Sequence, residues 1–476
     1  MAGNMQRVVH LDLKGAPPKI DFLEKVLLVI KSCGGTGVLI EWEDTFPYTG
    51  ELADIGSHGN SGGDGVYKPE EVQHIFNFIK ANGLLPIQLI QTFSHLEFVL
   101  KHPKFAKLRE LHESPACLCP CKPDSLPLVT AMVEQALNAQ PDAEYVHIGA
   151  DEIWHLGVCP DCQTRIAGDV DGTAVLYLDH IQAVANYIRS IRPNITILMW
   201  DDMLRGIKTD ILLRYDLGSK VQPVIWDYSP KEVFHIGASR WNVYSQLFPR
   251  VWAASAFKGA SGANQILAST YRYVSSNEAW LSEIKHNASS TVFAGIILTG
   301  WSRYDHYATL CELLPVAMPS LVSCLSLLTK PEDVPIETIM YETLPPSSWP
   351  GMQFATTLHK FAVLKEHANQ FLNGEVVGSW FNPWQIENSY TNPYKVVRIA
   401  SAARQFMTEL AALQSDLALG ISTITGQRSS EEWMKTYVCP IMTRISDLVK
   451  AAEARSNSEP SVSPSNNLYL WNNNVQ

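Results

Sequence analysis

The chain has 476 residues, of which 46% are hydrophobic and 18% are charged, and 37 Lys and Arg against 48 Asp and Glu give a net charge of −11. This balance is typical of a globular protein and excludes a largely disordered chain. The negative charge argues against nucleic acids and anionic membranes as partners, because phosphate binding requires clustered cations and the sequence has no run rich in Lys or Arg.

The sequence also lacks the usual targeting signals. The N-terminal residues have no apolar core of a secretory signal, and the apolar run 26–30 is too short for a membrane span because Lys25 and Lys31 flank it. Nine cysteines, an odd number, favour reduced thiols over a disulfide framework. We therefore expect a cytoplasmic protein without membrane association.

Short β-branched runs alternate with longer amphipathic stretches over the first two thirds of the chain. Eight such β–α alternations predict an α/β fold, namely a (β/α)8 TIM barrel over residues 1–328, with an open doubly wound sheet as the competing topology. The expected strands are Arg7–Leu13, Gly37–Glu41, Leu85–Gln91, Tyr145–Gly149, Ile195–Trp200, Val221–Trp226, Arg250–Ala254 and Phe293–Leu298. The expected helices include Phe22–Ser32, Pro69–Asn82, Leu126–Asn138, Ala174–Ile191 and Tyr273–His286.

The pattern changes after residue 328, where turn residues replace the strand alternation. Helical periodicity then predicts the spans Phe354–Leu372, Tyr394–Leu419 and Glu431–Ala454, the last with a kink at Pro440. We therefore expect a helical C-terminal domain over residues 329–455. The Ser-, Pro- and Asn-rich residues 456–476 are expected to form a disordered tail.

Aromatic and acidic residues follow the carboxyl ends of several expected strands, where the active site of a barrel is assembled. Trp200, Trp226 and Trp301 stand at three of these ends, with carboxylates close by. Aromatic rings pack on the C–H faces of a pyranose, and acids accept hydrogen bonds from its hydroxyls. The pattern therefore predicts a sugar pocket, although each tryptophan taken singly fits core packing equally well.

The pair Asp151–Glu152 follows the fourth expected strand and Gly149, which permits a sharp exit from that strand. Both acids are also compatible with a simple helix start, since acids favour the first turn of a helix. At a barrel mouth, adjacent carboxylates disfavour each other's ionisation, so we expect the pKa of at least one to be raised. One protonated and one ionised acid is the requirement of acid-assisted glycoside cleavage.

The segment His147-Ile-Gly-Ala-Asp-Glu152 resembles the His-x-Gly-x-Asp-Glu signature of glycoside hydrolase family 20, the β-N-acetylhexosaminidases. Gln91-Thr-Phe-Ser-His95 is similar to the family's histidine segment after strand three, and the resemblance covers residues 7–328. It implies a retaining exo-enzyme that removes terminal N-acetylgalactosamine or N-acetylglucosamine from a glycan or glycoconjugate. It also implies no cofactor and no catalytic metal, and the nucleus as a second compartment. A homodimer is an open alternative, because Trp380 and Trp384 could reach a neighbouring barrel mouth, although the sequence favours a domain interface for them.

The mechanism that this resemblance implies has no enzyme nucleophile, an exception to the two-carboxylate template. Glu152 would protonate the glycosidic oxygen while the 2-acetamido oxygen of the substrate attacks C1. Asp151 would orient the acetamido group, and Tyr228 would donate a hydrogen bond to its oxygen. Glu152 would then deprotonate the water that opens the oxazolinium ion. Sugar binding is assigned to His95, Trp200, Asp202, Trp226 and Trp301, although His95 also fits a core histidine and Asp202 a helix cap.

The sequence departs from the family after strand eight. Many members have Trp-Gly-Glu there, with the Glu accepting from sugar hydroxyls, whereas this chain has Trp301-Ser-Arg303. A cation that can only donate thus replaces an acceptor. We expect Arg303 and Asp305 to bind the C4 hydroxyl instead, with weak or unusual discrimination between gluco and galacto sugars.

Two other functions stay open. One is a retaining glycosidase with a protein nucleophile, Asp202 or Asp227, opposite Glu152. The other is a barrel that binds glycans without turning them over. Substitution of Glu152 by Gln separates these functions, because only an enzyme has turnover to lose.

Two cysteine motifs flank the fourth expected strand, so that their loops could meet. Cys117, Cys119 and Cys121 form a Cys-x-Cys-x-Cys motif, and Cys159 with Cys162 forms Cys-x-x-Cys, a common zinc half-site. The first motif is tight, and no second Cys-x-x-Cys accompanies it. The sequence therefore favours free thiols, with structural zinc as the alternative.

Overall fold

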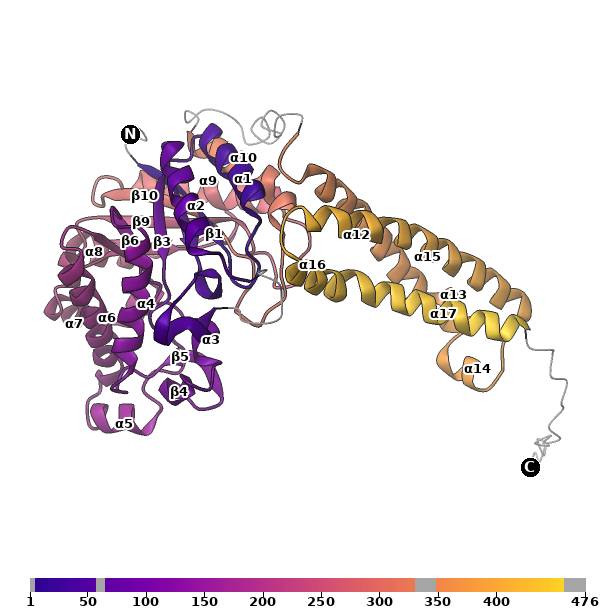
Figure 1. Cartoon of the computed structure of the whole chain (residues 1–476), viewed down its shortest axis with the longest axis horizontal. Coiled ribbons are helices and arrows are strands. Elements are labelled where there is room, and N and C mark those ends of the chain that lie inside the picture. Colours follow the sequence, from indigo (N-terminus) through magenta and orange to yellow (C-terminus); the bar gives the residue numbers. More distant parts are fainter. Residues whose placement is uncertain (1–4, 57–64, 330–347, 458–476) are drawn as a thin grey trace, which may run out of the picture. The chain divides into compact units, whose positions relative to one another are not determined.

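The structure is a computed structural model that describes residues 5–56, 65–329 and 348–457 (Figure 1). The chain divides into two compact units, one with residues 1–358 and 417–433 and one with residues 359–416 and 434–476. The expected tail, 456–476, lies outside the described residues apart from its first two. No described helix is both long enough and apolar enough to cross a membrane.

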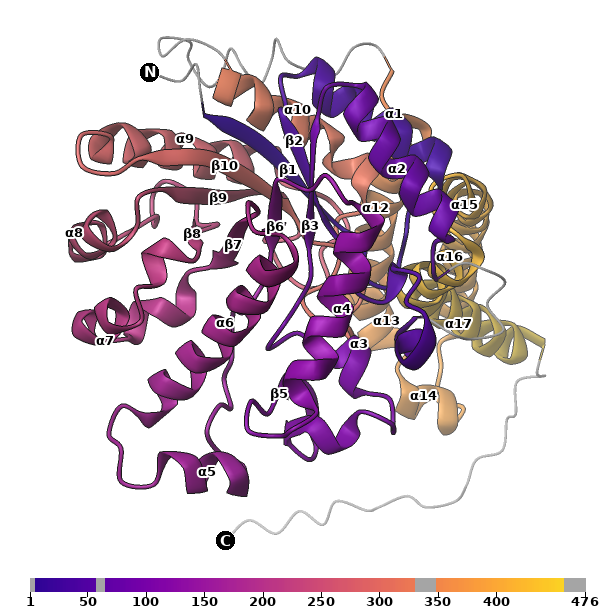
Figure 2. The same cartoon turned by 60° about the vertical axis from the view of Figure 1, so that its left-hand side comes forward.

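The first unit contains a closed barrel of eight parallel strands in the order β1-β10-β9-β8-β7-β6-β3-β2. Figure 2 shows the strands at the centre, with helices outside them. The predicted (β/α)8 barrel is thereby confirmed, and the open doubly wound sheet is wrong because β1 pairs with both β2 and β10. The strands are β1 (Gln6–Asp12), β2 (Gly37–Glu41), β3 (Leu85–Leu89), β6 (Tyr145–His147), β7 (Thr196–Trp200), β8 (Gln222–Trp226), β9 (Val251–Lys258) and β10 (Phe293–Gly300).

The barrel has a core of apolar residues from its strands, and the helices cover its outside. The core includes Val8, Leu39, Leu198 and Trp252, each fully buried. The helices contribute apolar faces of helical period, such as Phe22, Leu23, Val26, Leu27 and Ile30 on the first. The helices of this unit are α1 (Ile20–Ser32), α2 (Pro69–Ala81), α3 (Glu97–Leu100), α4 (Ser125–Ala139), α5 (Pro160–Ile166), α6 (Gly172–Ile191), α7 (Thr209–Arg214), α8 (Ala238–Leu247), α9 (Thr270–Asn287), α10 (Leu314–Thr329) and α16 (Gln427–Trp433).

A short antiparallel hairpin, β4 (Arg109–Leu111) with β5 (Ser114–Leu118), interrupts the connection between β3 and α4. The sequence analysis did not predict it, because strands of three and five residues carry too little alternation to be recognised. Cys119 and Cys121 follow the hairpin directly. Their sulfurs therefore lie beside those of Cys159 and Cys162, in the segment that follows β6.

The described residues after the barrel, 348–457, are mainly helical, as predicted. Besides α16, the helices are α12 (Met352–Asn373), α13 (Glu375–Trp380), α14 (Pro383–Glu387), α15 (Pro393–Ser422) and α17 (Cys439–Asn457), and α12 and α15 contribute residues to both units. The interruption expected at Pro440 takes the form of a π-helical turn over Met434–Val438 that precedes α17. Proline lacks the N–H that a continuous helix would need at this point.

Candidate active site

A cavity of about 210 Å³ lies at the carboxyl ends of the barrel strands. Small-molecule sites are concave and combine apolar walls with a few polar groups. Charged groups and aromatic rings share its wall. The lining residues are Lys14, Glu41, Gln91, His95, Asp151, Glu152, Trp200, Trp226, Tyr228, Gly259, Ala260, Trp301, Arg303 and Tyr304.

The loop after β6 presents Asp151 and Glu152 to this cavity through a sharply turned backbone. Gly149, Ala150 and Glu152 all have positive φ, at 64°, 66° and 47°. Such conformations cost free energy and concentrate at functional sites. A Cβ at the first of these positions would lie 1.9 Å from Oε1 of Gln91, so glycine there lets that side chain keep its place.

His95 lies between the two acids, and its own backbone also has positive φ, at 51°. Its Nε2 is 3.4 Å from Oδ2 of Asp151 and 3.4 Å from Oε2 of Glu152. Burial alone would lower the pKa of His95, but the charge of Asp151 and hydrogen bonds to both acids outweigh burial and hold this pKa well above its ordinary value. The hydrogen bond from His95 lowers the pKa of Glu152, against the opposing effect of burial.

We expected repulsion between Asp151 and Glu152 to raise the pKa of at least one of them. For Glu152 this expectation is wrong, because the imidazole of His95 lies beside it and lowers its pKa. The sequence alone does not show that His95 lies there. The raised pKa belongs instead to Asp202, where burial and then the charge of Asp151 raise it to about 7. Asp202 is not among the lining residues of the cavity. Its carboxylate accepts the backbone N–H of Glu152 at 2.8 Å and the indole N–H of Trp226 at 3.3 Å.

The three predicted tryptophans line the cavity from different strand ends. Trp200 is fully buried, and its ring lies 6.0 Å from that of Trp301. Trp226 stacks on Tyr228 with ring centroids 5.3 Å apart and an interplanar angle of 24°. Burial raises the pKa of Tyr228, so its phenol keeps its proton and can donate it to a hydrogen bond.

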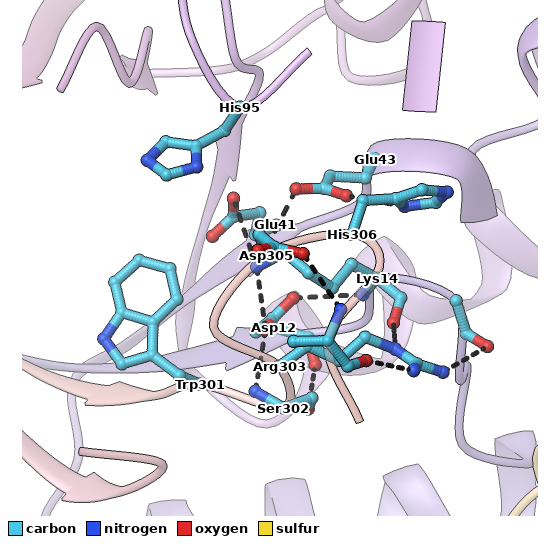
Figure 3. Close-up of polar contacts among 12 residues, drawn as sticks. Asp12, Lys14, Glu41, Glu43, His95, Trp301, Ser302, Arg303, Asp305 and His306 are labelled. Carbon is cyan, nitrogen blue, oxygen red and sulfur yellow. Dashed lines mark hydrogen bonds and ion pairs between the residues drawn. The ribbon is translucent and has the colours of Figure 1, made fainter. Parts of the chain in front are cut away.

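Opposite charges meet around Lys14, which the sequence analysis did not single out for the site (Figure 3). The Nζ atom of Lys14 is 2.9 Å from Oδ2 of Asp12, 3.7 Å from Oε1 of Glu43 and 3.9 Å from Oε1 of Glu41. Burial alone would lower the pKa of Lys14, but these three acids keep it well above its ordinary value. Burial would likewise raise the pKa of Glu41, but Lys14 and His10 lower it to about 2.

Lys14, Glu41 and Gln91 also line the cavity, although the sequence analysis assigned them no role in the site. Their position at the ends of β1, β2 and β3 was a usable signal, since the carboxyl ends of all eight strands meet at one rim. The signal was weak because many other polar residues follow these strands.

Arg303 and Asp305 occupy different environments. Arg303 lines the cavity, but its guanidinium pairs with both carboxylate oxygens of Glu432, at 2.5 and 2.6 Å, and contacts the backbone carbonyl of Lys14 at 3.2 Å. Asp305 is exposed and is not among the lining residues; its Oδ1 accepts the N–H groups of Tyr307 and Ala308 in a turn.

Two clusters of potential metal ligands occur within the described ranges. One consists of Glu43, Asp44 and His306, and here cationic side chains of the chain itself lie close by, Lys14 beside Glu43 and Lys101 Nζ 2.8 Å from His306. The other cluster, built from Glu110 and three cysteines, lies apart from the cavity wall.

Comparison with known proteins agrees with this geometry. Residues 41–257 match the glycosyl hydrolase family 20 catalytic domain. The chain is 36% identical to human hexosaminidase D, covering 96% of both proteins, and 42% identical to the hexosaminidase D of Bos taurus over 68% of this chain and 91% of that one.

Solved structures share the fold at lower identity. The chitobiase of Flavobacterium johnsoniae superposes with a TM-score of 0.53 at 13% identity, covering 94% of this chain and 71% of that one. The exo-β-N-acetylglucosaminidase of Vibrio harveyi gives a TM-score of 0.51 at 15% identity, covering 72% and 57%. The chain therefore belongs to glycoside hydrolase family 20, the β-N-acetylhexosaminidases, and is a glycoside hydrolase.

Proposed function

We propose that this hydrolase removes terminal N-acetylgalactosamine or N-acetylglucosamine with retention, and that the acetamido group of the substrate is the nucleophile. The observation that carries the proposal is the juxtaposition of Asp151, Glu152 and His95 at a cavity walled by three tryptophans. An acid, an orienting carboxylate and a sugar-sized aromatic pocket are the components that this reaction requires.

Glu152 is the proposed general acid and base. Its side chain is partly exposed at the cavity, where a glycosidic oxygen can reach it. His95 holds the shared proton of the free enzyme, and Glu152 delivers it to the leaving oxygen when bound substrate excludes water. His95 and Glu152 then titrate as a coupled pair rather than as separate residues.

Asp151 is the proposed partner of the acetamido N–H. It is buried at the cavity, and among the described residues its Oδ1 has no hydrogen-bond partner. A buried acceptor without a partner is costly, and an incoming amide N–H would satisfy it. As positive charge develops on the cyclising amide, the carboxylate stabilises it more than it stabilises the ground state.

Tyr228 is proposed to donate its phenolic proton to the acetamido oxygen, and Trp200, Trp226 and Trp301 to enclose the N-acetyl group and the sugar face. The stacking of Tyr228 on Trp226 restricts the orientation of the tyrosine ring. Asp202 is proposed as a positioning residue, because its two oxygens already hold the N–H of Glu152 and the indole of Trp226. The same contacts disfavour Asp202 as a protein nucleophile.

For the hydroxyl groups of the sugar we propose Lys14 and Glu41, which place a donor and an acceptor on the cavity wall. Arg303 donates a hydrogen bond to the backbone carbonyl of Lys14 and so helps to position Lys14. Asp305 contributes indirectly, because its carboxylate accepts the N–H of Tyr307 and stabilises the turn after Arg303. An ammonium group donates and a carboxylate accepts, so this pair can bind either an axial or an equatorial hydroxyl, and we expect weak discrimination between gluco and galacto sugars.

An assay with purified protein tests the proposed function. The aryl β-glycosides of N-acetylglucosamine and N-acetylgalactosamine should both be hydrolysed, whereas the plain aryl β-glucoside should not. A thiazoline that mimics the cyclised acetamido group should inhibit strongly. Rapid hydrolysis of the plain glucoside without thiazoline inhibition would instead favour a protein nucleophile.

We further propose that the enzyme works in the cytoplasm and nucleus and forms a homodimer. The thiols of Cys119, Cys121, Cys159 and Cys162 lie close together without disulfides, which suits a reducing compartment. Aromatic residues such as Trp384, which is 60% exposed, offer apolar surface that a second copy of the chain could cover. Microscopy of the tagged protein and its sedimentation mass test the two points.

A further inference from the structure

Four cysteine sulfurs and one carboxylate converge between two neighbouring loops of the barrel. Sγ of Cys119 lies 3.3 Å from that of Cys159 and 3.5 Å from that of Cys162, and Sγ of Cys121 lies 3.5 Å from that of Cys162. Cys119, Cys159 and Cys162 are buried, and Cys121 is half-buried.

These three distances are too long for bonded pairs, since a disulfide would bring two sulfurs to about 2.05 Å. A tetrahedral zinc ion with Zn–S bonds of about 2.3 Å separates its sulfurs by roughly 3.8 Å, close to the observed values. Cys119, Cys159, Cys162 and Glu110 have ligand atoms that all lie within 4.8 Å of one another. The sulfur of Cys121 adjoins this set through Cys162 and would take the fourth position after a side-chain shift.

The backbone around the cluster also suits thiolates. The N–H of Cys162 donates to Sγ of Cys159 at 3.4 Å, and the N–H of Cys121 donates to Sγ of Cys119. A guanidinium nitrogen of Arg165 lies 3.9 Å from Sγ of Cys121. Donors and a cation at these positions stabilise negative sulfur, which is the form that binds a metal.

Glu110 orients one loop relative to the other. Its Oε1 accepts the N–H groups of Val158 and Cys159, at 2.7 and 3.0 Å, and its Oε2 lies 3.3 Å from Sγ of Cys162. Because two backbone amides already occupy one oxygen, this carboxylate is suited to hold the loop in place while the four sulfurs bind a metal.

We propose that Cys119, Cys121, Cys159 and Cys162 form a structural zinc site. The fold supplies the second half-site that the sequence lacked, because the β4–β5 hairpin places Cys-x-Cys beside Cys-x-x-Cys. Cys159 follows β6 in the same loop that carries Glu152. Bound zinc would cross-link that loop to its neighbour and restrict the strained backbone of the catalytic acid.

Metal analysis of the full-length protein, purified with a non-thiol reductant and without chelators, tests the proposal. We expect one zinc per chain by elemental analysis and native mass spectrometry. Cys119→Ser and Cys162→Ser should lose at least about tenfold in zinc affinity. Cys117→Ser is the matched control, because Cys117 is also buried in the hairpin but its sulfur points to the carbonyl of Leu118 and not to the cluster.

Cobalt replacement on the wild-type chain keeps the test decisive if a serine variant fails to fold. Tetrahedral thiolate coordination should give strong sulfur-to-cobalt charge-transfer bands together with intense visible bands. The proposal is overturned if the wild-type protein contains no zinc and gives no such spectrum, or if Cys117→Ser loses zinc as Cys119→Ser does. Retention of zinc by Glu110→Gln but not by Cys121→Ser supports the four-sulfur set, and the opposite result contradicts it. None of these readouts depends on the sugar chemistry.

Discussion

Nε2 of His95 lies 3.4 Å from Oε2 of Glu152, so the proposed general acid of the free enzyme faces an imidazole rather than bulk water alone. The same nitrogen reaches Asp151, and the pKa of His95 is raised while that of Glu152 is lowered. In the proposed mechanism, the histidine of the free enzyme therefore holds the proton required for glycoside cleavage. The site binds this proton more tightly than an isolated carboxyl would.

The pH dependence of catalysis tests this arrangement. In the wild-type enzyme the basic limb of kcat/KM should follow the raised pKa of His95, because activity is lost when the shared proton leaves. In His95→Gln the proton must reside on a carboxyl, so the basic limb should move to lower pH by at least about two units. Rate profiles on an N-acetyl-β-hexosaminide measure the shift, with thermal unfolding as the folding control. An unmoved basic limb would show that His95 does not hold the proton.

Glu152→Gln should remove proton delivery while keeping the shape of the site. We expect kcat/KM to fall by roughly 10²–10⁴-fold with a poor leaving group, and by much less with an activated aryl leaving group that needs no proton. Glu144→Gln is a matched control, because Glu144 is exposed just before β6 and outside the cavity. Equal losses with both leaving groups would argue against an acid at position 152.

Asp202→Asn should change how stability depends on pH. The pKa of Asp202 is raised to about 7, so between about pH 4 and pH 7 the folded state keeps a proton that the unfolded chain releases. Wild-type stability therefore contains a contribution that is lost as the pH rises through this window. The variant lacks it, so the difference in Tm, variant minus wild type, should increase from about pH 5 to about pH 8. A constant difference would contradict the raised pKa.

Gly149→Ala should destabilise the protein and impair turnover. The alanine would have to adopt a positive φ, and its Cβ would clash with the side chain of Gln91. The backbone strain alone costs on the order of 1–3 kcal/mol, before the clash is counted. Urea unfolding measures the loss, and kcat/KM reports the displaced acid. Gly206→Ala serves as the control, because its added Cβ meets no atom within 4 Å among the described residues. Equal stabilities of the two variants would refute the steric argument.

Much of the fold was predictable, because each barrel strand is a short apolar run and the helices between them keep a regular amphipathic period. The loop carrying Asp151 and Glu152 was located for the same reason, since Gly149 ends a recognisable strand. The direction in which Arg303 points was not predictable. Its partner Glu432 lies 129 residues further along the chain, and no local pattern encodes such a pairing.

The electrostatics of the site depended on similar long-range contacts. His95 approaches the acids only because β3 and β6 are neighbours in the barrel. The pairing of β1 with β2 likewise places Lys14 among acids that include two from the β2 end. The cysteine motifs were visible in the sequence, but only the unpredicted β4–β5 hairpin shows that their sulfurs meet.

The central claim, that the substrate's own amide oxygen attacks C1, is tested most directly by a series of aryl glycosides whose N-acetyl group carries increasing numbers of fluorine atoms. Fluorine withdraws electrons from the amide oxygen and changes its size little, so an intramolecular attack must slow as fluorine is added. We predict a steep, progressive decrease in kcat/KM from the acetyl to the trifluoroacetyl substrate. A rate that does not change with fluorination, together with a trapped covalent sugar on a protein carboxylate, would contradict the account.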